Sequence, residues 1–383
     1  MKNYNHILHK ATTLLLTAAA ALSLCLLTGC NRVDLPETGK YNVSVQLDTK
    51  TIDPSEVGSI VIYAFADTDG SGNEKLVGYL NEKVSDTDTD GIFNMTLWSR
   101  GEDGYVDFYV LLNYDSDGFK ICDTNGEDVN FNAQTYSPHD IQRWTVLRRN
   151  PDNVPSDVST WKVPMSNLEE KTQPTGGSPE PNRRFYLEDI KGWQVIPIEV
   201  TRAVSKVEVW FWSNDNLPES NTGFNQNHQY TAINNMILTD PVNITEVFLP
   251  QGENADDYID AENQKTATNN TSYNGLTGGR FKPYTSGAFY SEEYFRLIWE
   301  QYILPNTFDG TTTLDVSYAH YFWDGWGWHG KTDYEKTKTI ELPYGPRNTK
   351  IIVWCQLNDN IDRSFTYTVV DWDEETIDIP AFD

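Results

Sequence analysis

The chain has 383 residues and a formal net charge of −27, with 56 Asp and Glu against 29 Lys and Arg. Nucleic-acid binding needs a basic face and attraction to anionic lipid needs basic clusters, so this charge disfavours both. Aromatic residues make up 13% of the chain and favour strands. The length is sufficient for two domains of ordinary size.

The N-terminus has the pattern of an export signal followed by a lipid attachment site. Lys2 and Lys10 accompany an apolar run, residues 12–27, that is too short for a stable membrane span. Leu27-Thr28-Gly29-Cys30 resembles the lipobox of bacterial lipoproteins, where a diacylglyceryl group joins the cysteine and the chain is cut before it. The resemblance implies that residues 1–29 form a lipoprotein signal peptide and that residues 30–40 are a lipidated tether. An ordinary secretory signal with a chance cysteine is the alternative.

Strand patterns fill the next part of the chain. Residues 41–48 alternate, with Val43, Val45 and Leu47 on one face, and residues 59–66 are almost continuously apolar, as in a central strand. Further strands are expected at 75–80, 92–98 and 105–114, and a short helix near 139–147. Residues 169–184 are rich in Pro, Gly and Thr and are expected to form a loop. Short strands separated by turn residues favour a β-sandwich.

The second half repeats this style, and we place a domain boundary near residue 198, between 41–197 and 198–383. A long strand should follow that boundary, with Val207, Val209 and Phe211 in phase. Residues 251–285 form a long insertion, and Ser291 with an acidic first turn suggests a short helix over 291–300. Strands are expected at 244–249, 314–322, 337–342, 350–357, 364–370 and 375–381. The predicted fold class is all-β.

Five motifs carry a resemblance to a known family. They occur in the order Ser59–Ala66, Val163-Pro-Met-Ser166, Val200–Val209, Tyr302-Ile-Leu-Pro-Asn306 and Val370-Asp-Trp372. With the lipobox and the alternating first strand, they resemble the fimbrillin-type lipoproteins of Bacteroidetes, the type V pilins and their anchor proteins. One departure is that the family's Pro-Glu-Asn type element here is Pro305-Asn306, without the Glu.

That resemblance implies a fold, a role and partners. The fold would be two transthyretin-like β-sandwich domains in tandem, and the role that of a structural subunit of surface fimbriae at the outer membrane. Other fimbrial subunits would be the partners, joined by β-strand exchange. A sandwich that lacks one strand exposes unpaired backbone groups and an apolar groove, and another subunit's strand can fill both.

The residues after the first strand bear on which kind of subunit this is. In polymerising members a protease cuts after a basic residue, usually Arg, in the loop that follows the first strand. Here Lys50 is the basic residue in the loop at 49–55, and no Arg lies between Arg32 and Arg100. Lys50 is therefore the candidate processing site, and its type favours a lipid-anchored base or anchor subunit over a polymerising stalk subunit.

A glycan-binding surface lipoprotein is a further alternative, based on Trp323, Trp326 and Trp328 in a Trp- and Gly-rich stretch. An exposed aromatic loop could stack on sugar rings or on a partner, although Trp side chains folded back over a sandwich edge are the simpler interpretation.

A calcium site is the other candidate that the sequence offers. Asp86, Asp88, Asp90 and Gly91 match the first half of an EF-hand loop, but Leu97 stands where the bidentate ligand belongs. We therefore expect a turn there and no metal.

Catalytic patterns are not found. His139, His228, His320 and His329 have no metal-ligand spacing, and neither a Gly-x-Ser-x-Gly elbow nor a phosphate-binding Gly loop occurs. A hydrolase would rest on acidic residues alone, so we expect no enzyme activity and no cofactor beyond the lipid on Cys30. Cys122 and Cys355 are expected to be buried thiols in preference to a disulfide.

Overall fold

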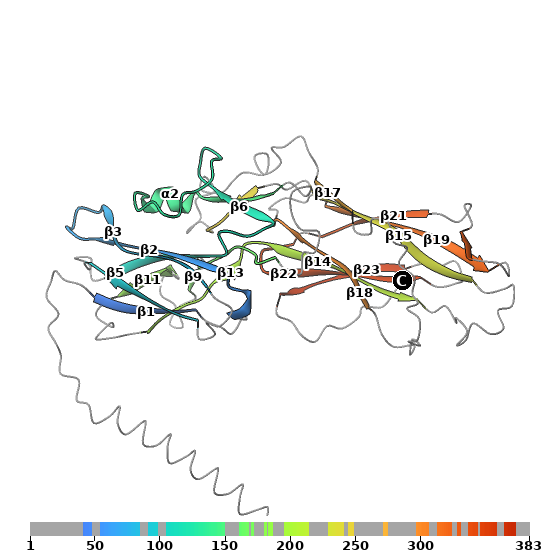
Figure 1. Ribbon diagram of the computed structural model, residues 1–383, viewed down its shortest axis with the longest axis horizontal. Coiled ribbons are helices and arrows are strands. Elements are labelled where there is room, and N and C mark those ends of the chain that lie inside the picture. The colour runs from blue at the N-terminus through green and yellow to red at the C-terminus, as the bar shows by residue number, and fades with distance from the viewer. Residues whose placement is uncertain are drawn as a thin grey trace, which may run out of the picture.

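The structure is a computed structural model. It describes residues 41–47, 54–84, 91–98, 105–149, 161–167, 170–171, 180–181, 183–186, 195–213, 229–240, 244–248, 271–274, 296–305, 312–323, 328–330, 336–343, 345–357 and 364–372. Strands dominate these residues, so the predicted all-β class is confirmed. The two halves of the chain follow one another along the long axis of the molecule, with the first half at one end and the second half at the other (Figure 1).

The first half contains the strands up to β13. Their bounds are β1 Tyr41–Leu47, β2 Ser59–Asp67, β3 Glu74–Lys83, β4 Ile92–Leu97, β5 Tyr105–Leu112, β6 Phe119–Cys122, β7 Thr145–Arg148, β8 Met165–Ser166, β9 Glu170–Lys171, β10 Glu180–Pro181, β11 Arg184–Tyr186, β12 Val195–Ile198 and β13 Thr201–Arg202. The 3-10 helix η1 spans Pro54–Glu56 and the helix α2 spans Pro138–Gln142.

The second half contains ten strands among the described residues. Their bounds are β14 Ser205–Ser213, β15 Gln229–Asp240, β16 Ile244–Glu246, β17 Thr271–Asn274, β18 Arg296–Ile303, β19 Thr313–Trp323, β20 Trp328–Gly330, β21 Lys336–Glu341, β22 Thr349–Leu357 and β23 Ser364–Asp371.

A nine-stranded sheet forms the body of the first half. Its order is β12-β1-β4-β3-β2-β5-β8-β13, with β11 paired to β5. A three-stranded sheet, β16-β7-β6, and the helix α2 lie along one side of it (Figure 1). The strand β16 comes from beyond residue 240, so the second half of the sequence contributes to this part of the molecule.

The strand β2 is buried on both faces. All nine of its residues are buried, which explains its continuous apolar sequence. On one face Tyr63 packs against Trp144, at 5.7 Å between ring centroids. On the other face Ala64 lies near Gly78, where an added Cβ would stand 2.5 Å from the Leu97 side chain of β4. β2 therefore lies at the centre of the first core, with buried side chains on both of its faces.

A two-sheet sandwich forms the second half. One sheet has the order β18-β14-β22-β23, and the other has β17-β15-β19-β20 with β21 also paired to β19. Val207 and Val209 of β14, which were predicted to share one face of a strand, are buried in its core with Met236 and Leu238 of β15. Cys355 of β22 lies in the same core. Cys122 and Cys355 are both free and buried.

Three sequence predictions need correction. Residues 296–300 belong to strand β18, so the helix predicted over 291–300 is wrong in its described part. Pairing with β14 provides a ladder and a buried face, and these outweigh the local helix signal. The helix predicted over 139–147 ends at Gln142, and Thr145 already begins β7. The strand predicted as one long element after residue 198 is divided into β13 and β14.

Candidate functional site

The first strand, β1, lies between two other strands. It pairs antiparallel with β4, from Tyr41 opposite Leu97 to Gln46 opposite Ile92. Its other edge pairs in parallel with β12, from Ser44 opposite Val195 to Leu47 opposite Ile198. The strand that begins the described fold is therefore an interior strand of its sheet, with both backbone edges in ladders.

The apolar side chains of β1 are buried in the first core. Val43 and Val45 are fully buried and Leu47 is 2% exposed, which confirms the predicted inward face. Ser44 is also buried, and its hydroxyl donates to Asn94 Oδ1 of β4 at 2.6 Å. Burying an aliphatic side chain of this size contributes about 1.5–3 kcal/mol. The three together contribute an amount comparable with the whole stability of a typical domain, about 5–15 kcal/mol.

The arrangement determines what loss of β1 would leave behind. Neighbouring strands lie about 4.8 Å apart, so β4 and β12 would be separated by roughly 10 Å, the width of one missing strand. Both would present unpaired backbone groups along a groove floored by apolar side chains. Such a groove would match the pattern of β1 itself, an extended segment whose alternate residues are apolar.

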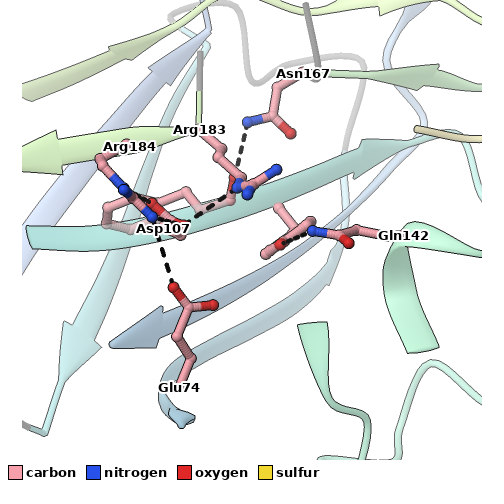
Figure 2. A network of polar contacts seen from close by, with 8 residues as sticks. Glu74, Asp107, Gln142, Asn167, Arg183 and Arg184 are labelled. Carbon is pink, nitrogen blue, oxygen red and sulfur yellow. Dashed lines mark hydrogen bonds and ion pairs between the residues drawn. The ribbon is translucent and has the colours of Figure 1, made fainter. Parts of the chain in front are cut away.

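A buried ion-pair network holds β11 against β5 (Figure 2). Asp107 of β5 is fully buried, and Arg184 of β11 binds it with two hydrogen bonds, Nε to Oδ1 at 2.8 Å and Nη2 to Oδ2 at 2.9 Å. Arg183 adds a third bond, Nε to Oδ2 at 3.2 Å. The Arg184 guanidinium also lies over the Tyr105 ring, at 3.8 Å from its centroid. These contacts hold β11 on the edge of β5.

Glu74 of β3 completes the charge balance of this network. Its Oε1 lies 3.7 Å from Arg184 Nη2. Burial raises the pKa of Glu74 above its ordinary value, and the neighbouring Asp107 charge raises it further. Hydrogen bonding to Asp107 raises the pKa of Arg184. The carboxylates of Asp107 and Glu74 are thus paired with the guanidinium groups of Arg183 and Arg184. Such mutual pairing is typical of a network with a structural role.

Arg202 connects the two halves of the molecule. It is 1% exposed and donates from Nη2 to Glu56 Oε2 at 2.8 Å and from Nη1 to Asn348 Oδ1 at 3.0 Å. Its guanidinium carbon lies 4.7 Å from the centroid of the Trp372 ring. Trp372 in turn stacks on Tyr302, at 5.7 Å and 7°. One buried side chain therefore contacts η1, the turn before β22 and the end of β23.

Lys206 lies next to the Arg202 contacts and forms ion pairs with two carboxylates. Its Nζ lies 2.8 Å from Glu208 Oε1 and 2.9 Å from Glu300 Oε2. Burial alone would lower the pKa of Lys206, but the two carboxylates raise it above its ordinary value. Burial raises the pKa of the nearby Tyr302 hydroxyl to about 12.

The structure places some predicted site residues and leaves others outside its described part. Trp323 and Trp328 are cross-strand partners at the start of the β19–β20 hairpin, so their positions share one face. Trp326, Cys30 and Lys50 lie outside the described residues, as do Asp86, Asp88 and Asp90. Leu97, the residue that argued against calcium, is fully buried in the first core.

Sequence reasoning missed the buried charges. Asp107 stands within Tyr105–Leu112, an otherwise apolar stretch, and such an interruption is the signal that a partner must exist. Arg183 and Arg184 end the loop that was predicted from its Pro and Gly content, and nothing in that composition indicates a buried role. Arg202 lies in one of the five motifs, but its partners are far away in the sequence.

Neither a membrane-spanning helix nor a metal centre is found in the part of the chain that the structure describes. The described residues contain no helix long and apolar enough to cross a membrane. Over the same ranges, no three His, Cys, Asp or Glu side chains gather in a way that could hold a metal ion.

Comparisons with known proteins find likeness among solved structures. No family model matches the chain, and no curated protein matches it. A fimbrial protein from Bacteroides vulgatus is similar at 13% identity and a TM-score of 0.47, over 86% of this chain and 99% of the other. A candidate cell adhesion protein from Bacteroides eggerthii is similar at 13% and 0.46, over 88% and 97%. A fimbrial assembly protein from Parabacteroides distasonis is similar at 10% and 0.39, over 87% and 98%.

Proposed function

We propose that this chain is a structural subunit of surface fimbriae, held at the outer membrane by lipid on Cys30 and joined to other subunits by β-strand exchange. The five sequence motifs in order support the family, and the setting of β1 supports the mechanism. A strand near the N-terminal end of the fold that pairs with β4 on one edge and with β12 on the other is a part that a second molecule's strand could replace. That setting is the observation that carries the proposal.

The subunit would consist of two β-sandwich domains, 41–197 and 198–383. Two separate apolar cores support this division. The first core also takes in Val200, Val204 and Tyr302, which suits a junction in which the domains are packed together.

The segment after β1 supports a specific place for processing. Residues 48–53, which include Lys50 and lie outside the described residues, connect β1 to η1 in the sequence, and Glu56 at the end of η1 binds Arg202. A cut near Lys50 would free β1 while leaving the Glu56–Arg202 contact with the remaining domain. Lys50 in place of Arg makes that cut less favourable, so we assign the chain to the anchor or base subunits, with the polymerising stalk as the alternative.

The test is the N-terminus of the protein taken from cells. Mass spectrometry should find a first residue at lipid-bearing Cys30. A start at Thr51 would overturn the anchor assignment and favour the stalk. The Cys30→Ala variant is the control, because without lipid it should leave the membrane fraction, and a variant that stays there would refute lipid attachment. Deletion of the gene should remove surface filaments or detach them, and unchanged filaments would refute the fimbrial role.

Glycan binding is a second candidate that one observation favours. Trp323 and Trp328 stand opposite each other across two strands, and paired aromatic positions on one face suit stacking against a sugar ring. A panel of polysaccharides should then change the tryptophan fluorescence of the wild type. A Trp323→Ala, Trp328→Ala variant should lose that response.

A further inference from the structure

The strand β23 has an apolar row that its own sheet leaves partly exposed. It is the end strand of the sheet β18-β14-β22-β23, as far as the described residues extend. Tyr367 is 44% exposed and Val369 is 38% exposed. Exposed apolar side chains that stand singly are common on protein surfaces, but these two belong to one face of one edge strand.

Register shows that this face points into the sandwich. Val369 pairs with Ile351, Tyr367 with Val353 and Phe365 with Cys355. Directly opposed residues of an antiparallel pair lie on the same side of the sheet. Ile351, Val353 and Cys355 are all in the second core, and Phe365 packs against it. The exposed row of β23 is therefore the margin of the core, and it continues a buried face to an open edge.

Such a margin fits one kind of occupant. The edge of β23 that no described strand pairs with offers backbone donors and acceptors in a line. The row Phe365, Tyr367, Val369 offers apolar contact at every second residue. The matching ligand is an extended segment with apolar residues at a spacing of two. Residues 373–383, which follow Trp372 and lie outside the described residues, contain Ile377, Ile379 and Ala381 at that spacing.

We propose that residues 375–381 of this same chain form a further strand along the free edge of β23. A three-residue connection, Trp372 to Glu374, sets the antiparallel register, and connections of this length are common in hairpins. In that register Ile377 lies opposite Val369, Ile379 opposite Tyr367 and Ala381 opposite Phe365. All three apolar pairs fall on the inner face.

The opposite face of the same register is also consistent. Asp378 falls opposite Thr368, so polar residues meet on the outer face. A slip of one residue would turn the Ile residues outwards and Asp378 inwards. Pro380 suits an outermost strand, because it cannot donate to a further ladder and so ends the sheet.

The occupant is the chain's own segment because its connection to β23 is short and fixed. Trp372 is held by its N–H, which donates to Asn348 O at 3.0 Å, and by its stacking on Tyr302. A segment tethered this closely has an effective concentration in the millimolar range. A second copy would have to approach against a net charge of −27 on each chain. This inference does not depend on the proposed fimbrial role, because it concerns the sheet of the isolated molecule.

Paired cysteines test the register in the full chain. Opposed residues of an antiparallel pair have Cα atoms about 4.5–5.5 Å apart, within the range that a disulfide spans. Val369→Cys with Ile377→Cys should oxidise to a bond within one chain, which peptide mass spectrometry identifies. The matched control, Val369→Cys with Asp378→Cys, moves one thiol to the other face and should form at least tenfold less.

Three outcomes would overturn the proposal: absence of the 369–377 bond, equal bond formation in the two pairs, or bonds that link two chains. Hydrogen exchange provides an independent readout that needs no cysteine. Amides on the free edge of β23 should be protected in the wild type and should exchange at least tenfold faster in the Ile377→Asp, Ile379→Asp variant. Unchanged exchange would refute the added strand.

Discussion

The strands β1 and β23 carry similar patterns and have opposite environments. β1 is the first described strand in the sequence and β23 is the last. Each has three alternating apolar residues on its inward face. In β1 these residues are buried because the sheet continues on both sides, through β4 and β12. In β23 two of them are more than a third exposed, because the described sheet ends there. An alternating pattern thus identifies an inward face, while the neighbours in the sheet decide how far it is buried.

The largest expected loss of stability comes from removing a buried charge in the first half, and we compare it with the removal of an exposed charge in the second half. Asp107→Ala should lower the free energy of unfolding by about 3–5 kcal/mol, because it leaves Arg183 and Arg184 without their buried partner. Asp315→Ala, which removes an exposed contact with Thr339, should cost at most about 1 kcal/mol. Denaturant unfolding followed by tryptophan fluorescence measures both. Similar losses would mean that the Asp107 network is not isolated from solvent.

A smaller loss of stability is expected when the same substitution, Val to Ala, is made in each of the two strands. Val45→Ala in β1 should lower the free energy of unfolding by about 2 kcal/mol, since it leaves a cavity in a fully buried site. Val369→Ala in β23, introduced into the Ile377→Asp, Ile379→Asp variant so that no added strand covers the site, should cost about 0.5–1 kcal/mol, because that side chain is then partly in water. Equal costs in thermal or denaturant unfolding would contradict the difference in environment.

The smallest effect concerns Tyr302, which belongs to β18 of the second half and packs in the first core. Its folded pKa, about 12, lies above the ordinary value of 10. The stability that it contributes is therefore complete below about pH 10 and is lost as the pH rises towards 12. Tyr302→Phe removes this dependence, so at pH 11 the wild type should lose about 1 kcal/mol more than the variant. Parallel pH profiles of the two proteins between pH 9 and 12 would contradict the assignment.

The sequence predicted those parts of the fold that depend on local pattern. The inward face of β1 and the central position of β2 followed from alternation and from a continuous apolar run, and both are confirmed. The twelve-residue strand β15 was missed because a bulge between Ile233 and Asn235 breaks its alternation. β18 was assigned as helix because Ser291 and the acids after it satisfy local capping rules, whereas a distant partner strand decides its form.

The candidate site was harder to predict, because its geometry depends on residues far apart in the sequence. A first strand of the right pattern could be identified, but its position between β4 and β12 could not, since parallel partners leave no turn signal. The partners of Arg202 are Glu56 and Asn348, from opposite ends of the chain. The lipidation of Cys30 and processing near Lys50 stay predictions.

The parallel pairing of β1 with β12 also sets an order of events in folding. Residues 44–47 emerge early, and their partners at 195–198 emerge only after most of the first half. Pairings between distant segments form late, because the intervening chain must close a large loop. Before that closure β1 has a ladder with β4 alone, and the opposite edge of the strand is open. During folding, β1 is therefore paired on one edge before it is paired on the other. Whether β12 or another strand pairs with the open edge depends first on how fast each one arrives, and only later on which pairing is more stable.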